Sequence, residues 1–261
     1  NIVPIIYGIL THKKIIWYIL EKPNFSFYFL FKILNFYSNI KVICISDSLG
    51  KKLRIKNYEV YFPAVNINFW KKTKIQNNKI LELTCVGNLN KTKNHYQLID
   101  FLKHSKKKFK LNIIGKSLTT QKYYYGKLKN LVNNINKNTL NKIIIYQNKK
   151  SSFIKKILDN TDIFILPSIS EGLSISLVEA MSMERICLVS KQSNHSKIIK
   201  NNYNGFEFNL DINSFSKTYG RASKLNYLKK KKIIKNARSE IIKIVDKNKF
   251  IEKNFQKIVQ Q

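Results

Sequence analysis

Short apolar runs alternate with longer amphipathic stretches along most of this chain. The short runs are rich in β-branched and aromatic residues and many of them end in glycine or proline, a pattern that predicts buried strands. Strands that alternate with helices predict parallel sheets with helices on both faces, and therefore an α/β fold. We expect strands at residues 2–7, 41–45, 58–62, 80–86, 109–114, 142–146, 162–166, 185–190 and 205–208.

The stretches between these strands predict helices, because their apolar residues recur at helical spacing. We expect Ser151 to cap one of these helices and the last helical stretch to break near Gly220 and near 226–229. The expected helices lie within 15–37, at 46–52, 94–106, 120–136 and 151–160, from 176, at 194–200, and from 212 to the end.

A polar stretch without periodicity, residues 67–78, predicts a linker between two domains. Residues 1–66 would form the first domain and residues 79–240 the second. Residues 241–261 predict a C-terminal helix, which we expect to pack back on the first domain. The chain does not begin with Met and opens directly in a strand-like run, so we expect the first domain to be incomplete at its start.

The charge of the chain is strongly unbalanced, because 48 Lys and Arg against 15 Asp and Glu give a formal net charge of +33. One interpretation is a polyanionic partner, such as nucleic acid or an anionic membrane. The other is mutational bias, because the abundant Lys, Asn, Ile, Tyr and Phe share A/T-rich codons. We favour bias and expect no specific nucleic-acid partner, since such a surface would use more arginine. The only arginines are Arg54, Arg185, Arg221 and Arg238.

Three cysteines, Cys44, Cys85 and Cys187, each lie in an apolar, strand-like run. Their number is odd and no pair has metal-ligand spacing, so they predict small core residues in a reducing compartment and no metal site. The most apolar segment, residues 25–34, is too short to span a bilayer and predicts a buried helix, with an interfacial membrane helix as the alternative. With no secretory signal in view, we expect a cytoplasmic protein.

The stretch 161–183 holds the most distinctive chemistry of the chain. It predicts a buried strand ended by Pro167, a small polar loop, and a helix from about Ser176. Glu171 would lie at the carboxyl end of the strand and Glu179 in the first turns of the helix. Open parallel sheets bind ligands at that end of their strands, and carboxylates there can accept hydrogen bonds from sugar hydroxyls.

Both acids also have a purely structural interpretation. Ser176 and Glu179 match a capping box, in which the two side chains only stabilise the start of a helix. The alternative for Glu171 is a solvated loop acid.

Small residues end three strands of the predicted second domain, at Gly87, Gly115 and Ser168. Backbone N–H groups and helix N-termini gather at such strand ends and suit phosphate. Lys91 and Lys93 follow Gly87, and either lysine is placed to meet a diphosphate.

Four segments of the chain carry recognisable motifs: 167–181 (PSISEGLSISLVEAM), 86–99 (VGNLNKTKNHYQLI), 43–70, and 201–208 (NNYNGFEF). In the first of them two acids frame seven residues, an E-x7-E arrangement followed by A-M. Together these segments resemble the retaining, nucleotide-sugar-dependent glycosyltransferases of the GT-B fold, glycosyltransferase family 4. The resemblance covers residues 43–208.

The resemblance implies a GT-B type architecture with two Rossmann-like domains and parallel sheets, the N-terminal domain being incomplete here. It implies transfer of a sugar from a nucleotide-sugar donor to a glycan or lipid-linked acceptor, with retention of anomeric configuration and without a metal or other cofactor. Glu171 would be catalytic and contact the donor sugar, Glu179 would bind the ribose, and Lys93 the diphosphate. Further donor-binding residues would be Gly87, Asn88, Gly172, Leu173 and Ser174, the last three through their backbone N–H groups.

The chain departs from the family pattern at several positions. Asn88 stands where the family has a diphosphate-binding arginine, Glu184 where a glycine precedes the next strand, and Ile186 where proline is usual. Segment 191–197 (KQSNHSK) lacks the usual glycine-rich turn. His12 is a candidate for the catalytic-side histidine of the family, and the alternative is a solvated histidine in a basic loop.

The acceptor of such an enzyme would be a growing polysaccharide or a lipid-linked glycan, and an anionic membrane surface on the cytoplasmic face would then be a further partner. Two hypotheses from other classes stay open: a non-catalytic basic α/β domain that binds polyanions such as nucleic acid, and an isomerase or phosphorylase with the same fold. Saturable nucleoside-diphosphate binding that is lost in Glu179→Ala would distinguish the transferase from the polyanion binder.

Overall fold

The computed structural model describes residues 3–19, 40–45, 47–61, 65–73, 80–105, 107–117, 119–171, 173–193, 195 and 198–259. The chain divides into two compact units, the first made of residues 1–64 and 243–261 and the second of residues 65–242. The helix expected at 25–34, the capping residue Ser46 and residues 74–79 of the expected linker lie outside the described residues.

The first unit contains a three-stranded parallel sheet in the order β1–β2–β3. The central strand β2 is almost wholly buried, as its apolar sequence predicts. The hydroxyl of Tyr58 donates a 2.8 Å hydrogen bond to Oδ1 of Asp47, which ties α3 to β3. The elements of this unit are α1 (Val3–Thr11), β1 (Ile15–Ile19), β2 (Ile40–Cys44), α3 (Asp47–Lys52) and β3 (Tyr58–Val60).

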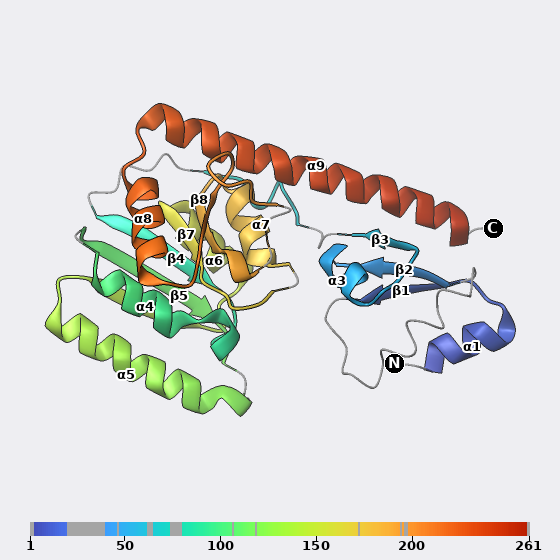
Figure 1. The fold of residues 1–261 in the computed structure, drawn as a ribbon, viewed down its shortest axis with the longest axis horizontal. Helices are drawn as coiled ribbons and strands as arrows, with labels where there is room; N and C mark the ends of the chain where they lie inside the picture. The colour runs from blue at the N-terminus through green and yellow to red at the C-terminus, as the bar shows by residue number, and fades with distance from the viewer. Residues whose placement is uncertain are drawn as a thin grey trace. The chain divides into compact units, whose positions relative to one another are not determined.

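The second unit contains a six-stranded parallel sheet in the order β6–β5–β4–β7–β8–β9 (Figure 1). From β4 the chain builds outward to β6, returns to β7 on the other side of β4, and builds outward again to β9. This is the strand order of doubly wound nucleotide-binding sheets. The strands are β4 (Leu81–Val86), β5 (Phe109–Gly115), β6 (Lys142–Gln147), β7 (Ile163–Leu166), β8 (Ile186–Ser190) and β9 (Phe206–Phe208).

From β4 to β8 an α-helix connects each strand to the next, so the predicted strand–helix alternation is confirmed over this part of the sheet. Three short 3₁₀ turns accompany them, η2 (Lys91–Lys93), η3 (Thr119–Gln121) and η4 (Lys191–Ser193). The α-helices are α4 (His95–Lys103), α5 (Lys122–Asn138), α6 (Ser151–Asp159), α7 (Ile175–Ser182), α8 (Ile212–Ser223) and α9 (Tyr227–Val259).

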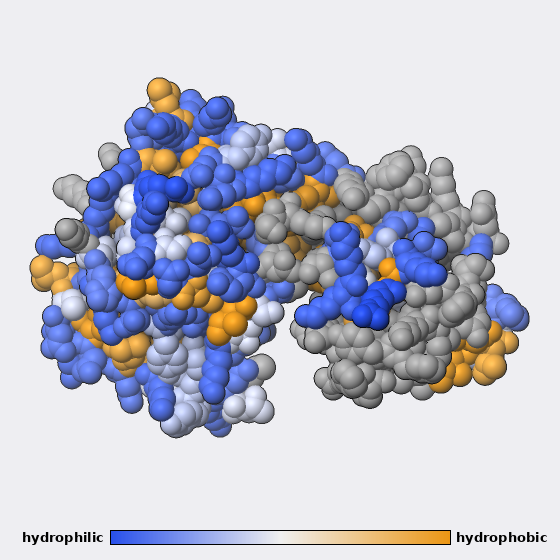
Figure 2. All heavy atoms as spheres, in the orientation of Figure 1, coloured by the Kyte–Doolittle hydropathy of each residue, from blue (hydrophilic) through white to orange (hydrophobic). Residues whose placement is uncertain are grey.

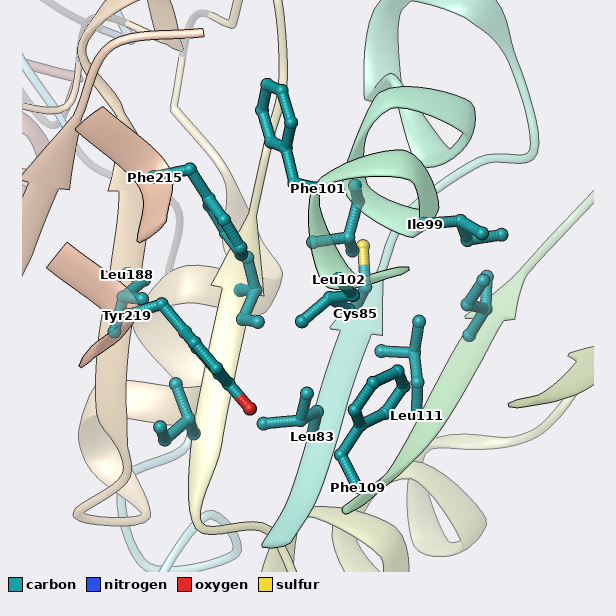
Figure 3. Close-up of a cluster of buried hydrophobic side chains, with 14 of the residues drawn as sticks. Leu83, Cys85, Ile99, Phe101, Leu102, Phe109, Leu111, Leu188, Phe215 and Tyr219 are labelled. Atoms are coloured by element: carbon teal, nitrogen blue, oxygen red, sulfur yellow. The ribbon is translucent and has the colours of Figure 1, made fainter. Parts of the chain in front are cut away.

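One large apolar cluster joins the sheet to α4, α5 and α8. Cys85 of β4 lies within it, and Phe215 of α8 stacks on Phe101 of α4 with ring centroids 5.1 Å apart (Figure 3). Cys85, Cys44 and Cys187 are all buried and unpaired, which confirms that they are core residues.

Two elements near the start of the chain were predicted wrongly. Residues 3–11, expected to begin with a strand, form α1, and residues 15–19, expected to be helical, form β1. The first run is apolar at nearly every position, so periodicity does not separate a buried helix from a strand. The second run, IIWYI, is wholly β-branched or aromatic and pairs in register with residues 40–44, so strand propensity and pairing decide its conformation.

Three details of the helices in the second unit were also wrong. α8 runs through Gly220, since one glycine costs a helix only about 1 kcal/mol and neighbouring residues of α8 are buried. The N-cap of α6 is Lys150 rather than Ser151, and its side chain makes no capping bond. The described residues of 194–200 form a turn instead of a helix, in which Ile198 and Ile199 both donate to the carbonyl of His195.

Hydrophilic residues cover most of the visible surface of the second unit, and apolar residues form small, scattered patches on it (Figure 2). Such a surface is ordinary for a folded domain in water. Within the described ranges, no helix combines the length and the apolar character needed to cross a membrane.

Candidate active site

Two predicted site residues follow the two strands between which the strand order reverses. Lys93 ends η2 after β4, and Glu171 lies in the loop after β7. Nζ of Lys93 and Oε1 of Glu171 form an ion pair, and only 15% and 12% of these side chains are exposed. Doubly wound sheets bind ligands at such a reversal, beyond the carboxyl ends of the strands. The structure therefore brings the predicted catalytic acid and the predicted diphosphate-binding lysine together.

The local sequence explains how Lys93 reaches this position. The side chain of Asn90 accepts a 3.0 Å hydrogen bond from the backbone N–H of Lys93 and closes the η2 turn. Asn94 follows with a φ of 57°, a left-handed conformation that asparagine tolerates. A Cβ atom at Gly87 would lie 2.9 Å from Cε of Lys93, so the glycine leaves room for the lysine side chain.

Close backbone contacts hold the loops at this edge of the sheet. The N–H of Ile169 after β7 donates a 2.8 Å hydrogen bond to the carbonyl of Thr92 after β4. A Cβ atom at Gly115 would lie 2.0 Å from the carbonyl oxygen of Gly87, so only glycine fits at the end of β5. The N–H of Gly87 donates to the carbonyl of Ile114, so in this structure Gly87 contributes room for the side chain of Lys93.

Glu179 lies on α7 and is partly buried. Burial raises the pKa of its carboxyl from 4.5 to about 7, and no hydrogen bond or ionic partner within the described part of the chain opposes that shift. An acid that is buried without a partner costs free energy, and such groups concentrate at functional sites. Glu179 is therefore a candidate for a ligand-binding residue, and its predicted contact with the ribose stays a prediction.

The capping-box interpretation of Ser176 and Glu179 is wrong. The N-cap of α7 is Ser174, and its side chain makes no capping bond. The hydroxyl of Ser176 donates a 2.8 Å hydrogen bond to the carbonyl of Val86 instead, which ties the start of α7 to the end of β4. Glu179 thus has no part in starting the helix.

Ser174 is buried, and its backbone N–H donates a 3.0 Å hydrogen bond to Nε2 of His195. The predicted contact between this N–H and the donor stays a prediction, and it would require exchange of that bond. Leu173 is partly buried beside it, and Gly172 lies outside the described residues.

Two polar residues after β4 are exposed. Asn88, which replaces the arginine of the family pattern, and Lys91 both face solvent. Lys91 forms no ion pair with any described residue, so it differs from Lys93, which is paired and only partly exposed. In the first unit, His12 is exposed at the end of α1 with a φ of 52°, and its role stays a prediction.

Glu184, which replaces the glycine of the family pattern, adopts a left-handed backbone with a φ of 56°. Its N–H donates to the carbonyl of Met181, and the N–H of Arg185 donates to the carbonyl of Ala180. These two bonds form a Schellman motif, which normally ends in glycine. The glycine of the family pattern therefore suits a left-handed backbone at the end of α7. With Glu184 at this position, the same backbone conformation costs free energy.

His195 is a buried residue near the site that the sequence reasoning did not single out. The only signal was that segment 191–197 lacks the glycine-rich turn of the family. Neither spacing nor composition indicates that this imidazole binds an amide at the start of α7.

A separate hollow of about 840 Å³ lies away from these residues, between the segment before β9, the end of α8 and the start of α9. Its polar lining is basic, with Arg221, Lys224, Lys229 and Lys232. We place the candidate active site at Lys93 and Glu171, because their ion pair lies at the strand reversal. Glu179 is included because it lies on α7, whose start is tied to the end of β4. Among the described residues, no group of three or more His, Cys, Asp and Glu side chains is arranged to hold a metal ion.

Known proteins resemble this chain in sequence and in structure. A UDP-Gal:alpha-D-GlcNAc-diphosphoundecaprenol alpha-1,3-galactosyltransferase of Escherichia coli is 40% identical over 63 residues, which span 24% of this chain and 16% of that enzyme. The structure of Anabaena Alr3699/HepE in complex with UDP and glucose matches with a TM-score of 0.77 and 14% identity, over 98% of this chain and 74% of that one. A glycosyltransferase from Rickettsia africae matches with a TM-score of 0.75 and 20% identity, over 93% and 70%.

A family comparison covers most of the second unit. Residues 66–240 match the description "Glycosyl transferases group 1", and these are 175 of the 261 residues. The parallel sheets and the similar structures agree with this match. The chain therefore belongs to the glycosyl transferases group 1 family and has an α/β fold of the GT-B type.

Proposed function

We propose that this protein transfers a sugar from a nucleotide-sugar donor to a glycan or lipid-linked acceptor. The observation that carries the proposal is the site at the strand reversal, where the Lys93–Glu171 ion pair lies beside a loop that leads to the unpartnered Glu179. Family membership supports the same activity. In this proposal all three residues face a donor at the carboxyl edge of the sheet.

Each of the three residues has a distinct proposed role. Glu179 accepts hydrogen bonds from the ribose hydroxyls, since it is a partly buried carboxyl that lacks a partner among the described residues. Lys93 neutralises the diphosphate. In the protein without a donor, the charge of Lys93 is paired with Glu171. When a donor binds, Glu171 turns from the lysine to hydroxyls of the sugar.

Two relatives guide the choice of donor and acceptor. The E. coli relative acts on UDP-Gal and a lipid-linked diphosphate acceptor, and Anabaena Alr3699/HepE binds UDP. We therefore propose a UDP-sugar as the first donor to test and a lipid-linked glycan as the acceptor. The net charge of +33 supports association with an anionic membrane surface, which co-sedimentation with vesicles of anionic and of neutral lipid would test.

Retention of configuration and independence of metal ions are further parts of the proposal. A departing nucleoside diphosphate carries negative charge that must be stabilised as the glycosidic bond breaks. Lys93 and the positive N-terminal end of α7 are available for this task at the edge of the sheet. Transfer that is unchanged in EDTA and a product with the anomeric configuration of the donor, identified by NMR, are the expected results.

A thermal-shift screen of UDP, GDP and ADP sugars tests the activity class first. A donor at one hundred times its dissociation constant should stabilise the fold by about 2.7 kcal/mol. Lys93→Ala should weaken donor binding at least tenfold, because the diphosphate loses its neutralising charge. Lys91→Ala is the matched control, since it removes the same charge two residues away at an exposed position, and it should change binding less than about twofold.

The same pair of variants separates this proposal from general attraction of polyanions. A basic surface that binds any polyanion would respond equally to the loss of either lysine. Equal effects of the two substitutions, or no stabilisation by any nucleotide sugar, would overturn the proposed function.

A further inference from the structure

A chain of four hydrogen bonds connects the ends of β7 and β8 to the start of α7. Nε2 of His195 accepts the N–H of Ser174 at 3.0 Å, and Nδ1 of His195 lies 2.7 Å from Oγ of Ser193. The hydroxyl of Ser193 donates to the carbonyl of Ser190 at 2.5 Å. The hydroxyl of Ser190 donates in turn to the carbonyl of Ser168.

The chain of bonds fixes the tautomer of His195. Since Nε2 accepts from an amide, the single proton of the neutral ring must lie on Nδ1. Nδ1–H can then donate to Oγ of Ser193, whose own hydroxyl donates to the carbonyl of Ser190. Every donor in the series therefore has an acceptor, and the direction of all four bonds is determined.

His195 stays neutral at the pH of most cells. Its side chain is 1% exposed, and burial lowers its pKa from 6.5 to about 4, with a further contribution from the positive charge of Lys93. A protonated ring would place a second N–H against the N–H of Ser174 and break the bond. The neutral ring is thus the form that can hold this amide.

The backbone amide that His195 binds lies between the two acids of the candidate site in the sequence. Ser174 is the N-cap of α7, the helix that carries Glu179, and it lies three residues after Glu171. Ser174 must keep a fixed position if Glu171 before it and Glu179 after it are to meet opposite ends of one donor, since small displacements of positioned groups cost large factors in rate.

We propose that His195 is a positioning residue of the donor site, which holds Ser174 at the start of α7 by accepting its backbone N–H. The inference rests on the proposed function, because it assigns Glu171 and Glu179, on either side of Ser174 in the sequence, to donor binding.

The test compares two substitutions of His195. His195→Leu removes the acceptor with a similar side-chain volume, and His195→Gln supplies an amide oxygen that can accept the same N–H. We expect the amide of Ser174 to lose protection from hydrogen exchange in His195→Leu and to keep it in His195→Gln. We expect the affinity for the nucleotide-sugar donor to fall at least tenfold in His195→Leu, and to stay within about threefold of the unsubstituted protein in His195→Gln.

A matched core variant separates positioning from general loss of stability. Phe109→Leu at the start of β5 removes buried packing away from this chain of hydrogen bonds, and it should leave donor affinity within about twofold. The proposal is overturned if His195→Leu exposes the Ser174 amide without weakening donor binding, or if Phe109→Leu weakens donor binding as much as His195→Leu does. If the unsubstituted protein binds no nucleotide while the exchange results hold, the proposed function fails together with the positioning role, and only the hydrogen bond stands.

Discussion

Glu179→Gln should make the protein more stable at high pH and worse at binding nucleotide. The carboxyl of Glu179 is partly buried, and burial alone raises its pKa from 4.5 to about 7. The free energy needed to keep the ionised form in the folded protein is therefore about 3 kcal/mol at pH 8, since each pKa unit is worth about 1.4 kcal/mol. Glutamine has nearly the same shape and carries no charge, so the variant avoids this cost.

The sign of the pH dependence follows from proton linkage. The folded protein binds more protons at this site than the unfolded chain between pH 4.5 and about 7, so ionisation of Glu179 lowers the stability of the protein as pH rises through that window. At pH 5 the folded carboxyl is still protonated and the penalty is small. The stability advantage of Glu179→Gln should therefore grow by about 2 kcal/mol between pH 5 and pH 8.

Urea denaturation at the two pH values measures this directly, with the free energy of unfolding of both proteins extrapolated to water. Asp100→Asn serves as the control for removing a carboxylate at an exposed position of α4. An advantage of Glu179→Gln that is equal at pH 5 and pH 8, or absent at pH 8, would refute the claim that this acid is buried without a partner.

Three other outcomes follow from the geometry of the site. Glu171→Gln should lower the transfer rate at least a hundredfold, because it removes the proposed catalytic carboxylate. The same variant should bind UDP more tightly, because Glu171 no longer competes with the diphosphate for Lys93. Calorimetry measures this binding, and weaker binding of UDP would contradict the prediction. Glu184→Gly should raise the free energy of unfolding by about 1 kcal/mol in urea, since it relieves a left-handed backbone, and a loss of stability would contradict the strain. Gly115→Ala should destabilise the fold by more than 2 kcal/mol because its Cβ meets a backbone carbonyl. Gly87→Ala should mainly weaken UDP binding, because its Cβ displaces the side chain of Lys93. Thermal melts and UDP titrations of both variants test this, and a larger loss of stability in Gly87→Ala than in Gly115→Ala would contradict it.

Much of the fold of the second unit could be predicted from the sequence. Each strand between residues 81 and 208 combines β-branched or aromatic residues with a closing glycine, proline or polar loop, and local signals of this kind need no tertiary information. The strand order could not be predicted in the same way, because pairing of β4 with β7 joins residues about 80 positions apart. The three-dimensional structure is therefore needed to show that Lys93 and Glu171 lie where the strand order of the sheet reverses.

The predicted site residues met different outcomes for physical reasons. The pair Glu171 and Glu179 was visible because acids are rare in this chain, and the pairing of Glu171 with Lys93 required the fold. The donor contact predicted for Gly87 stays a prediction, and the structure adds that this glycine leaves room for the side chain of Lys93. His195 could not be found from the sequence, since its partner is a backbone amide and amides carry no sequence signature.

Titration of UDP into the protein at about 0.15 M salt, followed by calorimetry, tests the central claim most directly. The account predicts saturable binding of one UDP per chain and at least tenfold weaker binding to Glu179→Ala, since the ribose then lacks its acceptor. Binding that does not saturate, or that has the same dissociation constant in Glu179→Ala, would contradict a nucleotide site between β4 and β7.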